Sequence, residues 1–368
     1  MELSVVIPTV GRPAKLLACL AGLARQTLAR GRFEVLVGLD GGEGPAEEAI
    51  RAALAGHGLA GKALACPKRG PAFVRNRLVE RATGDLILLL NDDVVPQPAC
   101  LETHLTEQGG LSRRGIEALV LGSAPWKVQE PDRLFDRLVR ETSMVFFYDR
   151  MSDDSDPARD WGFRHAWTLN LSLPRRLVAE AGWFSESLPS PRFEDIELAW
   201  RICSRGVPVL YRPRAVVEHD HRYEPTQYLE REFLLGFDAW SLAQTNSDCA
   251  QAIFGRDIAA PEELVYSRQF VLRERAQATS LEEGFLSLAG IPAGAIGGEH
   301  SRRLVSIAYQ QHLLLKRYVW RQGLIAAAEG HGATYLPLVN RCGSEGAHDR
   351  TPSSASRERT APPMSSRP

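Results

Sequence analysis

Apolar and polar positions alternate in blocks along the first third of the chain. Short runs of β-branched and aliphatic residues predict strands, and the stretches between them have the spacing of amphipathic helices. The predicted strands are residues 4–7, 33–39, 62–66, 85–90 and 117–122. Helices are predicted to begin at Pro13, Pro71 and Pro98, because the first helical turn tolerates the missing N–H of proline. This alternation predicts an α/β fold with a mostly parallel sheet flanked by helices.

The pattern changes in the second half of the chain. Irregular, aromatic-rich sequence begins near Trp161, with short strand candidates at 168–173, 208–211 and 215–218. Helical patterns then occupy residues 226–245, 261–276 and 302–329. From Gly343 the chain is rich in Ser, Pro, Thr and Arg and lacks apolar residues to bury, which predicts disorder. We therefore predict an α/β domain over residues 1–224 with halves at 1–123 and 124–224, a helical C-terminal extension at 225–340 and a disordered tail at 341–368.

Composition is that of a globular protein without a strong net charge. Apolar residues make up 44% and charged residues 24%, and 44 basic residues nearly balance 45 acidic ones, which argues against a nucleic-acid partner. The six cysteines lack the spacing of a zinc site, the N-terminus lacks a secretion signal, and no apolar run is long enough to span a membrane. We predict a cytoplasmic protein without a transmembrane segment, and peripheral association with the inner face of the membrane stays open.

Acidic residues follow the most apolar of the predicted strands. The run of residues 86–90 is buried on both faces if it is a strand, and it ends in Asn91, Asp92 and Asp93. Ligands bind at the carboxyl ends of strands in open α/β sheets, and carboxylate oxygens suit Mg²⁺ or Mn²⁺. The alternative is that the two aspartates form a turn or a helix cap before the proline that follows.

Two other strands also end in polar residues. Asp40 follows the second strand and precedes two glycines, where a carboxylate can hold a ribose or a base by charge-assisted hydrogen bonds. Pro8 and Thr9 close the first strand, and Arg12 follows. Taken alone, the Asp40 segment is better explained as a tight turn, and the residues after the first strand can be loop residues and nothing more. Three adjacent strands with polar ends nevertheless favour a shared site.

Three further groups are candidates for chemistry. Arg75, on the helix that begins at Pro71, can clamp a base or phosphate, although a solvated helix face is the simpler interpretation. Glu194 and Asp195 begin another helix, where the helix dipole stabilises acidic residues and where a rigid carboxylate can act as a general base. His219 ends a short strand and can bind a divalent metal, and His221 lies on the same side if the strand continues.

Taken in order, these segments resemble the inverting family 2 glycosyltransferases with the GT-A fold over residues 2–222. The matching segments are SVVIPTVGRPAKLLACLAGLARQT, VGLDGG, PAFVRNRLVERATGDLILLLNDDVVP and FEDIELAWRICSRG. They look like the opening strand and helix, the acidic second-strand end, the Arg-Asn helix with the metal strand, and the Glu-Asp helix of that family. Two positions depart from the family pattern. Asn91 stands where an aspartate is common, and Leu39 precedes Asp40 where paired aspartates are frequent.

The resemblance implies a role for each of these residues. Residues 1–123 become the nucleotide-sugar-binding half and residues 124–224 the acceptor and catalytic half. Asp93 would hold a divalent metal, Mn²⁺ or Mg²⁺, with His219 as a further ligand, and Asp195 beside Glu194 would be the catalytic base. Trp161, Trp167 and Trp183 are candidates for stacking on sugars. The implied nucleotide-binding residues are Pro8, Thr9, Arg12, Asp40, Arg75, Asn91 and Asp92.

We therefore expect an enzyme, a metal-dependent inverting glycosyltransferase of the hexosyltransferase kind. Its donor would be a nucleoside diphosphate sugar, with a UDP-sugar favoured, and its acceptor a hydroxyl group of a glycan, a lipid-linked molecule or a small molecule, in glycan or polysaccharide biosynthesis. Two alternatives stay open. A nucleotidyltransferase also needs a nucleotide fold and a metal but would release pyrophosphate, and the Asn91 departure is compatible with a catalytically silent nucleotide-sugar-binding module.

Overall fold

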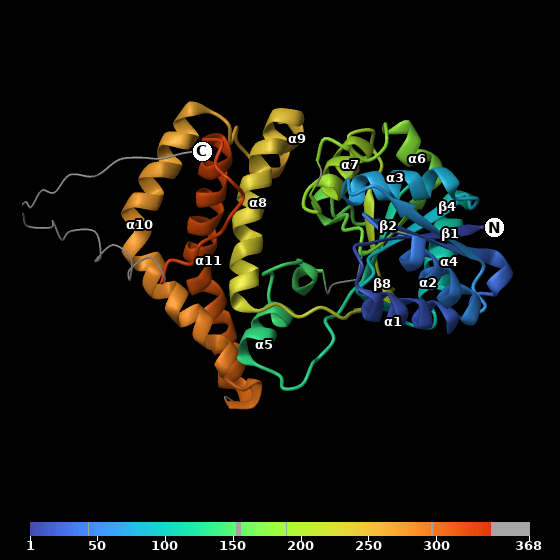
Figure 1. The fold of residues 1–368 in the computed structure, drawn as a ribbon, viewed down its shortest axis with the longest axis horizontal. Coiled ribbons are helices and arrows are strands. Elements are labelled where there is room, and N and C mark those ends of the chain that lie inside the picture. Colours follow the sequence, from blue (N-terminus) through green and yellow to red (C-terminus); the bar gives the residue numbers. More distant parts are fainter. Residues whose placement is uncertain (43, 152–155, 189, 296, 340–368) are drawn as a thin grey trace, which may run out of the picture. The chain divides into compact units, whose positions relative to one another are not determined.

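The computed structural model describes residues 1–42, 44–151, 156–188, 190–295 and 297–339. Within it, Met1–Tyr335 form one compact unit, and a second unit begins at Leu336, of which only residues 336–339 are described. The first unit contains a mixed sheet flanked by helices, followed by long helices (Figure 1). This architecture confirms the predicted α/β fold class with a helical C-terminal region.

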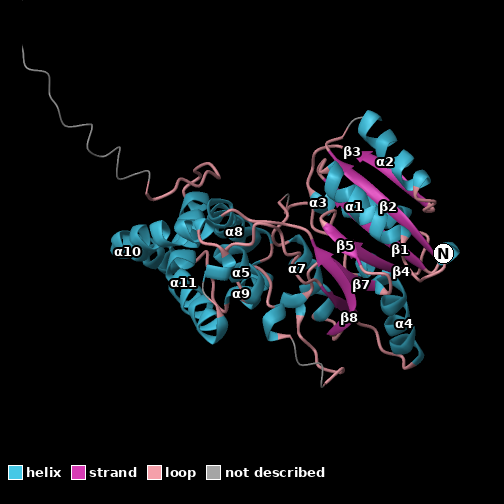
Figure 2. Ribbon diagram, turned by 90° about the horizontal axis from the view of Figure 1, so that it is seen from below, coloured by secondary structure: helices cyan, strands magenta, loops and turns pink. Residues whose placement is uncertain are grey.

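The strands in the described part of the chain form one mixed sheet with the order β3-β2-β1-β4-β7-β6-β8-β5 (Figure 2). Neighbours β3, β2, β1 and β4 run parallel, and so do β6 and β8, whereas β7 and β5 run antiparallel to their neighbours. Strands β1, β2 and β4 are buried on both faces, which explains why their sequences are almost continuously apolar. The strands are β1 (Leu3–Thr9), β2 (Phe33–Asp40), β3 (Gly61–Cys66), β4 (Leu86–Leu90), β5 (Val94–Pro96), β6 (Leu119–Ser123), β7 (Asn170–Pro174) and β8 (Val209–His219).

Helices cover both faces of this sheet. Two of them begin at the predicted prolines Pro13 and Pro71, whereas the helix predicted at Pro98 begins two residues later, at Cys100. The two short strands predicted at 208–211 and 215–218 are parts of one strand, β8. Its pairing with β6 shifts register between Gly122 and Ser123, and β8 continues past this irregularity. The helices of this part are α1 (Pro13–Ala24), α2 (Gly44–Gly56), α3 (Pro71–Arg81), α4 (Cys100–Arg113), α5 (Leu134–Glu141), α6 (Arg175–Glu180) and α7 (Glu194–Cys203).

A buried polar network fixes the place where β6, β7 and β8 meet. The Asn170 amide donates to the backbone oxygens of Ser123 and Ala215 at 3.0 and 2.8 Å, and its Oδ1 lies 2.9 Å from His104 Nε2. Burial lowers the pKa of His104 to about 4, so the ring is neutral at physiological pH. A Cβ at Gly122 would lie 2.1 Å from the Asn170 amide nitrogen, so only glycine fits there. The network holds β8 in the register that carries its last residue toward β4.

The chain after β8 is helical. It forms α8 (Pro225–Thr245), α9 (Ser247–Phe254), α10 (Pro261–Ser287) and α11 (Gly298–Ala328). Helix α11 lies against both α8 and α10 (Figure 1). Its crossing with α8 is close because both helices present glycine there: a Cβ at Gly236 would lie 1.8 Å from the Trp320 carbonyl oxygen, and one at Gly323 would lie 1.9 Å from that of Phe233.

The predicted domain boundary at residue 224 coincides with the start of the long helices, and the division into domains stays a prediction. The predicted disordered tail, residues 341–368, lies outside the described residues. None of the helices in the described ranges combines the length and apolar character that a bilayer crossing requires.

Candidate functional site

The carboxyl ends of β1, β2 and β4 open into a cavity of about 840 Å³. The start of α7, the end of β8 and side chains from α8, α9 and α11 complete its walls. A cavity at this edge of an open α/β sheet is the usual place for a ligand. All of the residues predicted for the site line it: Pro8, Thr9, Arg12, Asp40, Arg75, Asn91, Asp92, Asp93, Glu194, Asp195 and His219. Their individual roles stay predictions.

Arg12 links the two aspartates that follow β4. Its Nη1 donates to Asp93 Oδ2 at 2.8 Å, and its Nε and Nη2 contact the Asp92 carboxylate. The Thr9 hydroxyl donates to Asp92 Oδ2 at 2.6 Å. Burial raises the pKa of Asp92, although Arg12 and Thr9 act in the opposite direction. The ends of β1 and β4 are therefore joined by a half-buried cation between two buried carboxylates.

Asp40 orders the loop that leads into α3. Its Oδ1 accepts hydrogen bonds from the backbone N–H groups of Arg69 and Gly70 at 2.9 and 3.1 Å. Its Oδ2 lies 3.2 Å from the ammonium group of Lys68, a largely exposed side chain. Asp40 thus orders the turn, as the turn interpretation supposed, and its other oxygen pairs with an exposed lysine at the cavity wall.

Asp93 faces two histidines from the end of β8. His219 Nε2 lies 3.7 Å from Asp93 Oδ1, and His221 Nδ1 lies 3.3 Å from Oδ2. Burial alone would raise the pKa of Asp93, but the neighbouring histidines and Arg12 hold it well below its usual range. The backbone N–H of Asp220 donates to the Asp93 carbonyl oxygen at 2.8 Å, which ties the two segments together.

The polar atoms around Asp93 allow a test for a metal ion. Asp93 Oδ1 and His219 Nδ1 are buried without a hydrogen-bond partner, and Oδ1 is therefore free to bind a cation. Among the side chains that the structure describes, no three His, Cys, Asp or Glu residues converge as a ready metal centre. The residues fit a cation that takes one carboxylate and one imidazole from the protein and its remaining ligands from a bound substrate.

A buried ion pair lies under the opposite wall. Arg75 Nη1 donates to Glu194 Oε1 at 2.6 Å, and Nη2 donates to the Thr168 hydroxyl at 2.8 Å. The side chains of Arg75 and Glu194 are only 4% and 3% exposed. Both terminal nitrogens of Arg75, which was predicted to clamp the nucleotide, therefore already have protein partners. This pair anchors α3 to the first turn of α7.

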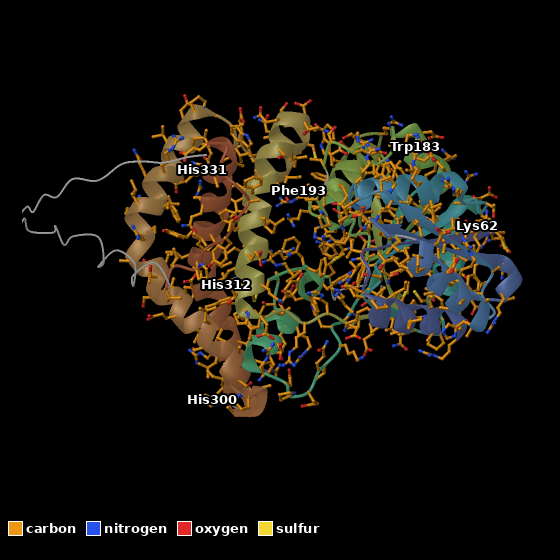
Figure 3. All side chains as sticks on the ribbon, in the orientation of Figure 1. Lys62, Trp183, Phe193, His300, His312 and His331 are labelled. Carbon is orange, nitrogen blue, oxygen red and sulfur yellow. The ribbon has the colours of Figure 1, made fainter. Side chains whose placement is uncertain are left out.

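Asp195, the next residue of α7, lines the cavity beside this pair. Burial, followed by the charge of Glu194, raises the pKa of Asp195 to about 7, against the opposing effects of Arg75 and of backbone N–H groups. A carboxylate with a pKa near the working pH is suited to take a proton from a hydroxyl group. The residue before the helix, Phe193, packs between α7 and α8 with Phe254 at a ring-centroid distance of 6.1 Å (Figure 3).

Aromatic rings line the part of the cavity between the histidines and α7. His219 stacks on Trp126 with centroids 4.2 Å apart, and Trp167 lines the cavity beside Phe146. Of the three tryptophans predicted to stack on sugars, only Trp167 is part of the wall. Trp161 contacts His165 instead, and Trp183 lies beside α6 (Figure 3).

Sequence reasoning missed the contribution of the long helices. Arg231 of α8 and Lys316 of α11 line the cavity, and so does Tyr223, which precedes α8. No sequence pattern distinguishes Arg231 from the other charged residues of a predicted helix. The only available signal was that Tyr223 closely follows His219 and His221 in the sequence.

Comparison with known proteins shows what part of this chain is similar to. The sequence model of glycosyl transferase family 2 matches residues 4–109. The pre-mycofactocin glycosyltransferase of Mycobacterium tuberculosis is 26% identical over 184 residues, which cover 49% of this chain and 36% of that protein. Validoxylamine A glucosyltransferase of Streptomyces hygroscopicus subsp. jinggangensis is 30% identical over 226 residues, covering 56% of this chain and 52% of that protein. The chain thus spans about half or less of the length of these curated relatives.

Among solved structures, the mannosyltransferase PcManGT from Pyrobaculum calidifontis, in complex with GDP-Man and Mn²⁺, has a similar fold. The TM-score is 0.51 at 18% sequence identity, and the match covers 89% of this chain and 86% of that chain. At this identity the likeness concerns the fold alone.

Proposed function

We propose that this protein is an inverting glycosyltransferase, and the match of residues 4–109 to the sequence model of glycosyl transferase family 2 supports this. It moves a sugar from a nucleoside diphosphate sugar to a hydroxyl group of an acceptor, with the help of a divalent cation. A UDP-sugar is the first donor to test. A GDP-sugar is the second, since the similarly folded PcManGT is in complex with GDP-Man and Mn²⁺.

One observation carries this proposal: two different carboxylate groups line the same cavity. Asp93 is ionised and lies beside histidines, whereas Asp195 has a pKa of about 7 and begins a helix in another wall. Groups whose surroundings push their pKa values apart are suited to different tasks in one reaction.

In the proposed reaction Asp195 accepts the proton of the acceptor hydroxyl group. The oxygen then bonds to the anomeric carbon of the donor as the bond from that carbon to the diphosphate oxygen breaks, so the configuration at the carbon inverts. The bond electrons leave with the nucleoside diphosphate. Asp195 later releases its proton to water.

Asp93 and His219 would hold the cation, with His221 as the other imidazole in reach. When bound, a divalent cation neutralises the charge that develops on the leaving diphosphate. Thr9, Arg12, Asp40 and Asp92 would orient the nucleoside. The acceptor class, a role in glycan or polysaccharide biosynthesis and a cytoplasmic location belong to this proposal as well.

The donor is tested by thermal unfolding with a panel of nucleoside diphosphate sugars, each with and without Mn²⁺. A ligand that binds the folded state at 100 times its Kd stabilises it by about 2.7 kcal/mol, which a melting curve detects. We expect a shift with at least one donor that grows with Mn²⁺ and is lost in Asp93→Asn. A panel without any shift would refute donor binding.

The mechanism is tested with Asp195→Asn. This variant is expected to bind the donor as the wild type does and to lose about 100-fold or more in turnover, measured as nucleoside diphosphate release. Asp248→Asn is the matched control, because Asp248 is also the second residue of its helix, α9, but is exposed and does not line the cavity. Unchanged turnover in the Asp195 variant, or pyrophosphate as product, would contradict the proposal.

A further inference from the structure

Two cations from the long helices reach the cavity wall. Arg231 of α8 and Lys316 of α11 both line the cavity, and both contact the same carboxylate, Glu232, at 2.7 and 3.4 Å. The Glu232 side chain is 1% exposed, whereas those of Arg231 and Lys316 are 26% and 30% exposed. Lys316 also donates to the carbonyl oxygen of Met144 at 3.3 Å. A buried carboxylate thus holds two partly exposed cationic side chains that line the cavity.

The local charges do not cancel. One carboxylate, Glu232, faces two cations, which leaves a net positive charge where the helices meet the cavity. Several other cations of the cavity wall have a carboxylate partner of their own, such as Glu194 for Arg75 and Glu186 for Arg69. A concave wall with uncompensated positive charge attracts an anion, and guanidinium groups bind phosphate oxygens well.

Arg231 lies at the Asp93 end of the cavity. Burial raises the pKa of the Tyr223 hydroxyl group, and the charges of Arg231, Asp93 and Glu232 also act on it. The Tyr223 ring packs edge-on against His221 at a centroid distance of 4.3 Å, and His221 Nδ1 lies 3.3 Å from Asp93 Oδ2. Arg231 therefore acts on Tyr223, whose ring contacts His221, and His221 contacts the carboxylate to which we assign the cation.

The other end of α8 lies near the proposed base. Asp238, seven residues after Arg231, accepts hydrogen bonds from Ser190 and Arg192, just before α7. Seven residues of helix span about 10 Å. Arg231 is therefore displaced toward Asp93, where the diphosphate is expected, and away from Asp195, where the acceptor hydroxyl is expected.

We propose that Arg231 and Lys316 form an anion site for the diphosphate of the donor and of the nucleoside diphosphate product. This inference rests on the proposed function and extends it, because it assigns part of the donor site to the helices that follow the family 2 domain. The same chemistry would suit an anionic group of the acceptor, which the experiment separates.

The test measures binding of UDP, GDP and the corresponding monophosphates by calorimetry in the presence of Mn²⁺. We expect Arg231→Met to weaken diphosphate binding about tenfold or more, because it removes a charge-assisted contact. Binding of the monophosphate should change less than about twofold. Lys316→Met should act in the same direction. Arg317→Met is the matched control, since Arg317 is the next residue of α11 but is exposed and does not line the cavity.

Each outcome decides the matter. If Arg231→Met binds the diphosphate as tightly as the wild type does, the proposal is overturned. If that variant then loses only acceptor-dependent turnover, the site belongs to the acceptor. Equal losses for mono- and diphosphate also overturn it, because they indicate a general distortion. Circular dichroism melting of each variant shows whether the fold is intact. Arg231→Lys preserves the charge and is expected to retain more affinity for the diphosphate than Arg231→Met.

Inorganic pyrophosphate distinguishes failure of this inference from failure of the proposed function. Suppose that the wild type binds no nucleotide, that pyrophosphate raises its melting temperature, and that Arg231→Met abolishes this rise. The anion site is then supported and the nucleotide-sugar function is refuted. If neither nucleotide nor pyrophosphate binds, both the anion site and the nucleotide-sugar function are refuted.

Discussion

Replacing Asp195 with asparagine is expected to stabilise the folded protein above neutral pH. Burial, with the charge of Glu194, raises the pKa of Asp195 from 3.8 to about 7. The carboxyl group of the unfolded chain ionises near the ordinary value. When folding raises the pKa of a group, the resulting stability is fully present below the pKa of the unfolded chain. It is lost as the pH rises through the pKa of the folded protein. The wild type should therefore lose stability between about pH 4 and pH 7 because of this residue.

The magnitude follows from the size of the shift. About 3 pKa units correspond to about 4 kcal/mol once both states are ionised. The Asp195 side chain keeps partial exposure to the cavity, so this value is an upper limit. Of that loss, roughly 2–3 kcal/mol should develop between pH 5 and pH 8.5. Asparagine does not ionise and escapes the loss.

Urea unfolding at these two pH values measures the effect. At pH 8.5 the free energy of unfolding of Asp195→Asn should exceed that of the wild type by up to roughly 2–3 kcal/mol more than it does at pH 5. Asp248→Asn should differ from the wild type by only a few tenths of a kcal/mol at either pH, from the helix dipole. A difference for Asp195→Asn that is the same at both pH values would refute the reasoning.

Three other outcomes are expected. Turnover should rise about tenfold from pH 6 to pH 8, because the proton-accepting form of Asp195 appears through a pKa of about 7, and a flat pH–rate profile would contradict its role as a base. Arg75→Met leaves the buried Glu194 carboxylate without its ion pair, so urea unfolding should show a loss of about 3–5 kcal/mol, whereas a loss below about 1 kcal/mol would mean that water reaches the pair. Gly323→Ala pushes a methyl group into the backbone of α8 and should lower the free energy of unfolding by about 1–3 kcal/mol, while Gly284→Ala, in open space on α10, should be neutral or stabilising; equal effects would exclude a close helix crossing.

Much of the fold follows from local sequence because the central strands are apolar on both faces. Strands β1, β2 and β4 are such runs, and prolines mark the starts of α1 and α3. Strand β5 has only three residues, too few for a pattern, and Arg212 to Arg214 interrupt the apolar run of β8. The partner strand β6 and the network around Asn170 let β8 continue through this polar segment, which no local pattern could indicate.

The candidate site was predictable where residues follow parallel strands. Thr9, Asp40 and Asp92 belong to one edge of the sheet because the strands before them run in the same direction. The ion pair of Arg75 with Glu194 was not predictable, since the two residues meet only through tertiary packing. The cations of α8 and α11 were missed for the same reason: charged residues on long helices are usually exposed.

The contribution of α11 to the cavity also has a consequence for synthesis of the chain. All sheet strands have left the ribosome soon after β8 is complete, but Lys316 lies on the last long helix. At about 5–20 residues per second, the ribosome needs roughly 5–20 s to add the residues from the start of α8 to Lys316. During that interval the carboxylates at the strand ends lack their opposite wall. A nascent chain should therefore gain its sheet first and its ability to retain an anionic ligand only with the emergence of α11.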